Sequence, residues 1–543
     1  MKITDAEKFS LNQISLIALT SLFFVIFSNI SFYQNFLTSY GSSNNYIHLL
    51  TIFIVLFSLI CLIFTIFSSK YTIKPILIIA LLASSFASYF MDSYNVIIDN
   101  DMIRNVVQTD AKESFDLISV KLILYVLFLG IAPSFLIYKA KITHKSWRSE
   151  LFGKLKFIAI LLIVILSILV TFSKFYTSFF REYKPLRYYT NPTYWIYSAG
   201  SFVFESSVST PDSLKEIGKD AIIEKSGQNQ DKGKLVIMVV GETARADRFS
   251  LNGYEKETNP ELKKEKNIVT FREMYSCGTS TAISVPCMFS IFDRSDYSYK
   301  KSSSTKNVLD VLSNTQKVAI LWRDNNSDSK GVATRVDFQD YKSSQNNTIC
   351  DETECRDEGM LVGLDEYIAN HPKKDILIIL HQMGNHGPAY YKRYPKKFEK
   401  FTPTCKTSQL DKCTSQEIGN AYDNSILYTD YFLAKTIDFL KPYAKTHKTA
   451  MFYISDHGES LGEKNLYLHG LPYFIAPDTQ KHVASIMWLG SMEENIDYKK
   501  LKSYENNDLS HDNIFSTLLG LFEVKTSIYD GKKDITKPAR KSQ

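Results

Sequence analysis

The sequence predicts two parts with different folds: an N-terminal bundle of five transmembrane helices and a C-terminal α/β/α domain with a mostly parallel sheet. Charged residues are scarce before residue 181, where only 14 of the 63 Lys and Arg and nine of the 57 Asp and Glu residues lie. Long apolar runs fill this first third, and short apolar runs recur in the remainder. The 36 Phe and 33 Tyr residues exclude disordered and fibrous classes.

Each long apolar run approaches the roughly 20 residues that a helix needs to cross a bilayer. The runs span residues 14–32, 47–67, 73–91, 117–138 and 155–173. The first is long and is followed by others, so we interpret it as a retained helix and not as a cleaved signal peptide. The run 73–91 contains Ala83, Ser84 and Ser85, and the alternative for it is a buried or interfacial helix.

The basic residues of the connecting loops predict the orientation of the helices. Segment 33–46 has no Lys or Arg, whereas segment 139–154 has five. Positive loops stay in the cytoplasm, so we expect the N-terminus inside and everything after residue 175 on the exported side. From residue 181 onward the charges nearly balance, with 49 Lys and Arg against 48 Asp and Glu. A basic surplus confined to the apolar third indicates membrane topology, and we expect no nucleic-acid partner.

The cysteines agree with an exported location. Cys61 lies in the second apolar run. The other six form close pairs in the sequence, namely Cys277/Cys287, Cys350/Cys355 and Cys405/Cys413. An oxidising compartment favours disulfides, but six cysteines allow 15 connectivities, so local pairing is a preference and not a deduction. A zinc–cysteine site is the alternative, although the sequence has no CxxC pair.

Two segments with different sequence patterns follow the membrane helices. Residues 176–234 are expected to form a bridge, with aromatic side chains suited to the membrane interface, a helix near 211–225 and a polar linker at 226–234. Short apolar runs then lie at 235–240, 317–322, 375–380, 449–454 and 484–489. Runs of this length that alternate with helices indicate a parallel sheet. We therefore divide the chain into a transmembrane domain (1–175), a bridge (176–234) and an exported α/β domain (235–543).

Candidate functional residues directly follow three of the short runs. Glu242 follows the first, His386 lies in a stretch after the third, and Asp456 and His457 follow the fourth. Functional groups gather beyond the carboxyl ends of parallel strands. One His at a strand end is ordinarily a hydrogen-bonded loop residue, but three strand ends that each carry Glu, Asp or His favour a metal site. Mixed carboxylate and imidazole ligands suit Zn²⁺ or Mn²⁺.

A candidate nucleophile lies in the hydroxyl-rich stretch 276–282 (SCGTSTA), which precedes a helix predicted from Ala282. A hydroxyl at a helix N-terminus beside a divalent cation is easier to deprotonate, and the N–H groups there can bind an anionic phosphoryl group. The alternative is a capping loop without chemistry.

Several long motifs in one order resemble the phosphoethanolamine transferases that modify lipid A in Gram-negative outer membranes. The motifs are VVGETARADRFSLNGY, SCGTSTAISVPCMFS, LWRDNNSDSKGV, HQMGNHGPAYYKRYP, SDHGESLGE and LHGLPY. The resemblance covers essentially the whole chain. It implies an anchor in the bacterial inner membrane and a periplasmic domain of the alkaline-phosphatase/sulfatase type. It also implies transfer of phosphoethanolamine from phosphatidylethanolamine to lipid A, or to another envelope acceptor, through a covalent threonine intermediate.

The resemblance implies roles by position within these motifs. The implied nucleophile is Thr281, with Thr279 as its local competitor. The implied ligands of one catalytic zinc are Glu242, Thr281, Asp456 and His457. The residues expected to contact substrate phosphate or a second zinc, and to include the general acid, are His386 and His469. The implied phosphoryl contacts are Asn326, Ser327 and Lys330.

The membrane part offers one further set of polar residues. Asn105, Thr109 and Glu113 are four residues apart, so they share one face if 101–114 is helical. A carboxylate there could hold an ethanolamine ammonium, a role that the resemblance supports; the alternative is a solvated helix face. The first and third cysteine pairs fit the family's disulfides, whereas Cys350/Cys355 encloses a short loop and its pairing stays open. We expect a monomer in contact with the bilayer.

Three alternative functions stay open at this point. A five-span glycerophosphotransferase of the kind that builds lipoteichoic acid has a similar domain, although the cysteine pairs and the CGTST motif disfavour it. A metal-dependent phosphatase or phosphodiesterase would use water in place of the second acceptor. A membrane-anchored sensor with an inactive domain is the third, and the complete set of candidate nucleophile and ligand residues argues against it.

Overall fold

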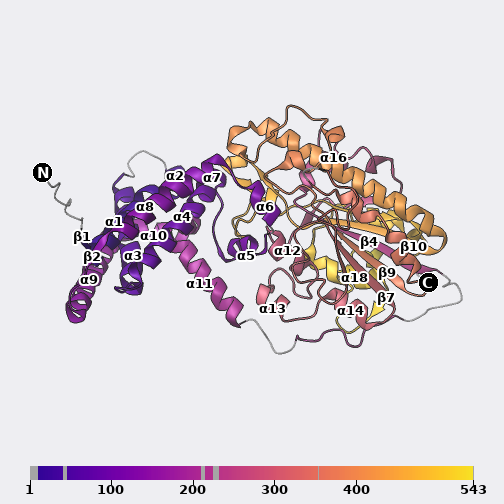
Figure 1. Cartoon of the computed structure of the whole chain (residues 1–543). Helices are drawn as coiled ribbons and strands as arrows, with labels where there is room; N and C mark the ends of the chain where they lie inside the picture. Colours follow the sequence, from indigo (N-terminus) through magenta and orange to yellow (C-terminus); the bar gives the residue numbers. More distant parts are fainter. Residues whose placement is uncertain are drawn as a thin grey trace. The chain divides into compact units, whose positions relative to one another are not determined.

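The computed structural model describes residues 10–40, 46–109, 111–208, 214–223, 232–351 and 354–541. They divide into two compact units (Figure 1). The first unit contains residues up to 103 together with 118–203, and the second contains 104–117 together with the chain from 204 onward. Segment 104–117 is thus part of the second unit, although apolar helices precede and follow it in the sequence. The domain boundaries at 175 and 234 stay predictions.

Four helical runs of the first unit are long and apolar enough to cross a membrane. They are α3 (Tyr46–Phe67), α4 (Ile73–Tyr94), the continuous run of α7 (Val120–Tyr125), η1 (Val126–Ile131) and α8 (Ala132–Lys139), and α9 (Trp147–Thr171). A bent pair of helices, α1 (Gln13–Phe27) and α2 (Ile30–Tyr40), differs in direction by 53° and passes the same test when taken together. With this pair counted as one span, the described residues contain the five predicted spans.

The bend in the first span was not predicted, because the apolar run 14–32 continues through it. Asn29 is buried at the bend, and its side-chain amide donates to the carbonyl oxygens of Phe24 (2.9 Å) and Asn191 (2.6 Å). Its side-chain oxygen accepts a hydrogen bond from the backbone N–H of Asn191 (2.9 Å). A polar group buried among apolar side chains needs hydrogen-bond partners within the protein. Asn29 finds these partners in Phe24 and Asn191, at the bend.

The bridge differs in part from its prediction. It contains α10 (Ser173–Glu182), η2 (Lys184–Tyr189) and α11 (Thr193–Val208). The helix expected near 211–225 is wrong for the described residues 214–223, which form a turn at 219–220 and end in β3 (Ile222–Ile223), paired with β15 (Val524–Lys525). Gly218 has a φ of +58° and packs so closely on Val311 that a Cβ would lie 2.6 Å from its side chain. Tertiary pairing therefore overrides the local helical pattern, and most of the predicted 226–234 linker lies outside the described residues.

The second unit is built on a seven-stranded sheet. Its order is β5 (Ile268–Thr270), β13 (Ser485–Leu489), β10 (His447–Ser455), β4 (Gly233–Gly241), β9 (Asp375–His381), β7 (Val318–Asp324) and β8 (Asp337–Asp340). The strands from β10 to β8 are mutually parallel, and β13 is antiparallel to both neighbours. The mostly parallel sheet is confirmed, and all five predicted runs are strands. The prediction missed only β5 and β8 of this sheet, because β5 is short and β8 is a polar, largely exposed edge strand.

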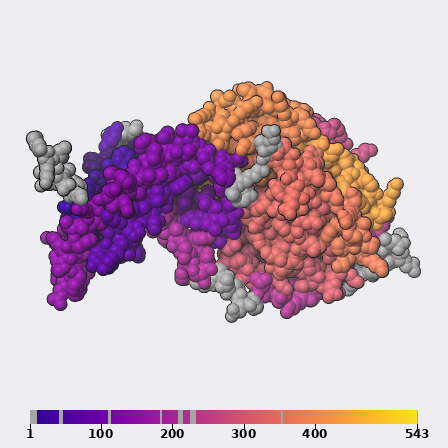
Figure 2. Space-filling model, viewed as in Figure 1, coloured from indigo at the N-terminus to yellow at the C-terminus, as the bar shows by residue number. Residues whose placement is uncertain are grey.

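Helices cover both faces of this sheet, as the buried strands require. The side chains of Val236, Met238 and Val240 pack in one apolar cluster with residues of α12 (Thr281–Met288), α14 (Val308–Asn314) and α18 (Ile514–Leu521). The long helix α16 (Ser415–Leu440) lies on the other side of the sheet (Figure 1). Because the central strands are almost completely buried, helices and loops form the surface of this unit that Figure 2 shows.

All three close cysteine pairs form disulfides. The Cα atoms are 6.2 Å apart in Cys277–Cys287, 3.8 Å in Cys350–Cys355 and 5.7 Å in Cys405–Cys413. Cys61 is a free, buried thiol in α3. The preference for local pairing is confirmed, including the middle pair, and these six cysteines are not metal ligands.

We predict that the unreduced, denatured full-length chain reacts with one equivalent of a maleimide, because Cys61 alone carries a thiol. Reduction before labelling should raise the value to seven equivalents, which mass spectrometry of the intact protein measures. Three or more labels before reduction would show that at least one of these disulfides is absent.

Candidate active site

The ends of three neighbouring strands bring the candidate residues together. Gly241 at the end of β4 is in register with Ser455 at the end of β10, and Val240 is in register with His381 at the end of β9. The chain segments that follow these strands therefore begin side by side at one edge of the sheet. This arrangement explains why Glu242 and the pair Asp456–His457 meet although more than 200 residues separate them.

Glu242, Asp456 and His457 form a buried cluster with the geometry of a metal site. One potential ligand atom from each lies within 4.8 Å of the others, and all three side chains are inaccessible to solvent. Nε2 of His457 is 3.5 Å from Oε1 of Glu242 and 3.3 Å from Oδ2 of Asp456. In the described part of the chain neither carboxylate pairs with a Lys or Arg side chain. Two buried carboxylates without such a partner favour the binding of a cation.

The protonation states of the side chains in this cluster suit residues that bind a cation. Burial, with a smaller contribution from His469, lowers the pKa of His457 to about 4. Its Nδ1 lies 2.9 Å from the carbonyl oxygen of Gly458, which can only accept, so the ring is neutral with its Nε2 lone pair toward the cluster. Burial and the charge of Glu242 raise the pKa of Asp456 well above its ordinary value. A divalent cation would remove this repulsion, and oxygen and imidazole ligands of this kind suit zinc.

The hydroxyl of Thr281 contacts two members of this cluster. Thr281 is the first residue of α12, and Ser280 is the N-cap. Its Oγ1 donates to Oε2 of Glu242 (3.1 Å) and lies 3.3 Å from Nε2 of His457. The hydroxyl of Thr279 instead donates to the carbonyl oxygen of Leu471 (2.6 Å). The structure therefore places Thr281, and not its competitor Thr279, against the ligand candidates.

Asn326 touches the same carboxylate. Its side-chain amide donates to Oε2 of Glu242 (2.9 Å) and to the carbonyl oxygen of Gln382 (2.8 Å). Ser327 and Lys330 contact each other, with Nζ of Lys330 donating to Oγ of Ser327 at 2.5 Å. The backbone N–H and the hydroxyl of Ser327 both donate to Oδ1 of Asn326, at 2.6 and 3.0 Å. The three predicted phosphoryl contacts thus form one chain of hydrogen bonds from Lys330 through Ser327 and Asn326 to Glu242.

The two predicted histidines lie beside the cluster. The ring centroid of His469 is 4.3 Å from that of His457 and 5.8 Å from that of His386. Nδ1 of His469 lies 3.2 Å from a carboxylate oxygen of Glu459. Glu459 is itself buried, and burial raises its pKa to about 8. Glu459 lies in the SDHGESLGE motif, but its contact with His469 was not predicted from the sequence.

The loop after β9 packs directly on the backbone of Glu242. The backbone N–H of Asn385 donates to the carbonyl oxygen of Glu242 (3.1 Å), and its side-chain amide donates to the same atom (3.2 Å). Gly384 has a φ of +50°, and a Cβ there would lie 2.9 Å from that carbonyl oxygen. Only glycine permits this close approach without a shift of the backbone. The loop that carries His386 is therefore fixed relative to the cluster.

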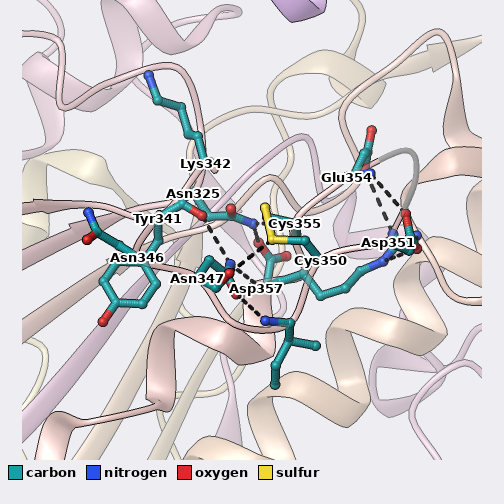
Figure 3. Close-up of a disulfide and its surroundings, with 12 residues drawn as sticks. Asn325, Tyr341, Lys342, Asn346, Asn347, Cys350, Asp351, Glu354, Cys355 and Asp357 are labelled. Atoms are coloured by element: carbon teal, nitrogen blue, oxygen red, sulfur yellow. Dashed lines mark hydrogen bonds and ion pairs between the residues drawn. A yellow bond between two sulfur atoms is a disulfide. The ribbon is translucent and has the colours of Figure 1, made fainter. Parts of the chain in front are cut away.

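Figure 3 shows the Cys350–Cys355 disulfide and the residues around it, among them Asn325 and Asp357. The side-chain amide of Asn325 donates to the carbonyl oxygen of Cys355 (3.1 Å) and to the carboxylate of Asp357 (2.8 Å). Asp357 also accepts the backbone N–H groups of residues 383 and 384, at 2.9 and 3.1 Å. The disulfide and the loop of His386 thus share one buried hydrogen-bond network.

Two positioning residues were missed by sequence reasoning. Thr243 has a φ of +58°, unusual for a β-branched residue; its N–H donates to Asp456 (3.1 Å) and its hydroxyl to Glu242. His511 accepts the backbone N–H of Cys277 (3.1 Å), and its other ring nitrogen lies 3.0 Å from the carbonyl oxygen of Ser455. Burial lowers the pKa of His511 to about 3, which keeps the ring neutral. The only sequence signal for His511 was its place among the histidines of the exported half.

Residues 101–114 do not form one continuous helix, which was the condition for Asn105, Thr109 and Glu113 to share one face. The chain forms α5 (Asn100–Gln108) and then α6 (Ala111–Asp116), and Asp110 lies outside the described residues. The hydroxyl of Thr109 donates back to the carbonyl oxygen of Asn105 (2.7 Å) just after the end of α5, a bond that competes with helix continuation. The backbone of Glu113 lies in α6, but its side chain is outside the described residues, so its predicted contact with an ammonium stays a prediction.

Comparisons with known proteins cover both units. The family model described as "Sulfatase" matches residues 234–524, and the model described as "Phosphoethanolamine transferase EptA/EptB" matches residues 56–206. The chain is 43% identical over 524 residues to phosphatidylethanolamine transferase Mcr-1 of Escherichia coli, covering 95% of this chain and 96% of that protein. It is 38% identical over 546 residues to phosphoethanolamine transferase EptA of Escherichia coli strain K12, covering 98% of both.

Solved structures agree with the sequence comparisons. The integral membrane lipooligosaccharide phosphoethanolamine transferase A (EptA) from Neisseria meningitidis matches with a TM-score of 0.94 and 34% identity, covering 98% of this chain and 100% of that chain. The soluble domain of the same enzyme matches 61% of this chain and 99% of its own length, with a TM-score of 0.58 and 39% identity. Because the similarity spans nearly the full length of each protein, this chain belongs to the phosphoethanolamine transferase family.

Proposed function

We propose that this protein transfers phosphoethanolamine from phosphatidylethanolamine to lipid A, or to another envelope acceptor, through a covalent intermediate on Thr281. The proposal rests mainly on the position of the Thr281 hydroxyl at the start of α12. Its Oγ1 lies 3.1 Å from Oε2 of Glu242 and 3.3 Å from Nε2 of His457. The name of the Mcr-1 relative supports phosphatidylethanolamine as the donor. The lipooligosaccharide named for the Neisseria enzyme supports an acceptor that carries lipid A.

The proposal includes one catalytic Zn²⁺, with Glu242, Thr281, Asp456 and His457 as its ligands. The fit rests on the donor set: two buried carboxylates, a neutral imidazole with Nε2 toward the cluster, and a hydroxyl. When bound, zinc would supply a lower pKa for the threonine hydroxyl and positive charge against the phosphoryl oxygens. A second zinc would have His386 and His469 as neighbours.

In the first half-reaction Oγ1 of Thr281 attacks the phosphorus of the donor. The bond between Oγ1 and phosphorus forms, and the bond between phosphorus and the glycerol oxygen breaks, releasing diacylglycerol. The hydroxyl proton passes to solvent, since bound zinc would lower the pKa of the hydroxyl, and Oε2 of Glu242 orients Oγ1 by accepting its hydrogen bond. His386 or His469 gives a proton to the leaving oxygen.

In the second half-reaction a phosphate or hydroxyl oxygen of the acceptor attacks the same phosphorus. The bond between phosphorus and Oγ1 of Thr281 breaks, and the proton that the acceptor oxygen releases replaces the one Thr281 lost and restores the hydroxyl, so the kinetics are ping-pong. Asn326 keeps Glu242 oriented through its hydrogen bond in both steps. The ammonium of Lys330 supplies a positive charge for the phosphoryl oxygens, next to the hydroxyl of Ser327.

The membrane helices would place the enzyme where its donor is. We propose a multi-pass inner-membrane protein with five spans, a cytoplasmic N-terminus and a periplasmic catalytic unit, acting as a monomer. The support is the basic loop 139–154, the apolar helices and the oxidised cysteines. The donor is a component of the same bilayer, so it can reach the enzyme without leaving the membrane.

We predict that Thr281→Ala abolishes transfer, lowering the rate by about 10⁴-fold or more, because no other hydroxyl occupies its position. The measurement is mass spectrometry of the tryptic peptide that contains residue 281, after incubation of the full-length protein with phosphatidylethanolamine. The wild type should carry phosphoethanolamine on Thr281, and Thr281→Ser should recover part of the signal.

Near-normal lipid A modification by a folded Thr281→Ala protein would contradict the role of Thr281. Free phosphoethanolamine with no product on any acceptor would indicate a phosphodiesterase, and glycerophosphate on Thr281 would indicate a glycerophosphotransferase.

We predict that Asp456→Asn combined with His457→Ala lowers the zinc content of the purified protein at least about tenfold, since two of the proposed ligands are lost. Elemental analysis by plasma mass spectrometry measures the metal independently of activity. His447→Ala is the matched control, because His447 begins β10 at the strand end opposite to Ser455. Unchanged zinc in the double variant would remove both residues from the ligand set.

A further inference from the structure

Arg393 joins three separate segments of the second unit. It follows the His386 loop and is only 4% exposed. Its Nε donates to the carbonyl oxygen of His386 (2.6 Å), and one terminal nitrogen pairs with the carboxylate of Glu354. The other terminal nitrogen lies 3.2 Å from Oδ2 of Asp116. The planar guanidinium can hold all three partners at once, which a lysine ammonium on a flexible stem would do with less precision.

Asp116 is the partner that is most distant from Arg393 in the sequence, because it lies in the segment 104–117 of the second unit. It is the last residue of α6, its side chain is 11% exposed, and it also pairs with Nζ of Lys392 at 2.5 Å. Burial opposes its ionisation, but Lys392 and Arg393 outweigh this effect and lower the pKa of Asp116. The carboxylate is therefore charged at neutral pH, in a poorly solvated place where charge-assisted hydrogen bonds are strong.

The segment that ends in Asp116 has two further attachments to the same unit. Nζ of Lys330, which contacts Ser327, also donates to the carbonyl oxygen of Gln108 (3.2 Å). The guanidinium of Arg104 pairs with Glu205 (3.1 Å) and stacks on the ring of Tyr299 (3.7 Å to the centroid). The attachments at Arg104, Gln108 and Asp116 bracket Asn105 and Thr109. Two of these three attachments are made by Lys330 and Arg393, which adjoin the candidate active site.

We propose that Arg393 is a positioning residue that holds the segment 104–116 and the His386 loop in one fixed relation, with Asp116 as its anchor. The inference rests on the proposed function, with His386 at the donor phosphate, and on the predicted role of the segment that carries Asn105 and Thr109 in binding the ethanolamine. The two ends of one small headgroup, phosphate and ammonium, are then bound by two chain segments that Arg393 connects. The affinity for the lipid donor depends on this connection.

Removal of the Asp116 charge should loosen the segment without unfolding the site. Arg393 keeps its pair with Glu354 and its bond to the carbonyl oxygen of His386, so no buried cation is left without a partner. The distances between Thr281, Glu242 and His457 do not involve Asp116. The expected signature is therefore a change in donor affinity and not in the chemical step.

The test uses the full-length protein in lipid nanodiscs with graded amounts of phosphatidylethanolamine. Asp116→Asn should raise the KM for the donor about tenfold and leave kcat within about twofold. Asp116→Glu should restore most of the affinity, because the charge returns. In a double-variant cycle, the KM of the protein with both Asp116→Asn and Arg393→Lys should be little higher than that of Arg393→Lys alone. Both substitutions remove the same connection, so their effects on the KM should not add.

Glu265→Gln is the matched control. Glu265 pairs with Lys441 at 2.8 Å, its side chain is 16% exposed, and Lys441 lies just beyond the end of α16. This variant should leave KM and kcat unchanged. An unchanged KM in Asp116→Asn, or a fall in kcat and in melting temperature at constant KM, would overturn the inference. A wild-type protein that forms no adduct from the lipid would instead contradict the proposed function itself.

Discussion

The site depends on two carboxylates, those of Glu242 and Asp456, held together where water does not reach. Two such charges repel each other strongly in a poorly polarisable interior, and a fold that keeps both has to supply positive charge between them. The described chain offers a neutral imidazole, His457, and no Lys or Arg partner. Protonation of Asp456 or a bound divalent cation would relieve this repulsion, and the hydroxyl of Thr281 lies beside Glu242 and His457, where it would share such a cation.

The backbone around the carboxylates is organised to keep them in place. Thr243 adopts a strained conformation and hydrogen-bonds both of them, while Asn385 and Asn326 fix Glu242 from the neighbouring strand ends. His511 joins the segment before Thr281 to the end of β10. The parallel sheet makes this possible, because adjacent strand ends collect residues from distant parts of the chain at one edge. Rigid support of this kind keeps a nucleophile within reach of its partners.

The fold and the centre of the site were predictable for the same reason. Buried strands leave continuous apolar runs, and Glu242, Asp456 and His457 directly follow such runs. The membrane spans were equally visible in composition, but the bend at Asn29 was not, because Asn191, one of its hydrogen-bond partners, is 162 residues away. The role of His511 was hidden for that reason too, since its partners are backbone groups of remote segments. Local periodicity carries no information about contacts of this kind.

X-ray diffraction from crystals of the full-length protein at the zinc absorption edge tests most directly whether Glu242 and Asp456 hold a metal beside Thr281. We expect a strong anomalous peak bounded by Glu242, Asp456, His457 and the hydroxyl of Thr281. Crystals grown with zinc that show no peak there, and in which one carboxylate is instead paired with a Lys or Arg side chain, would contradict the account.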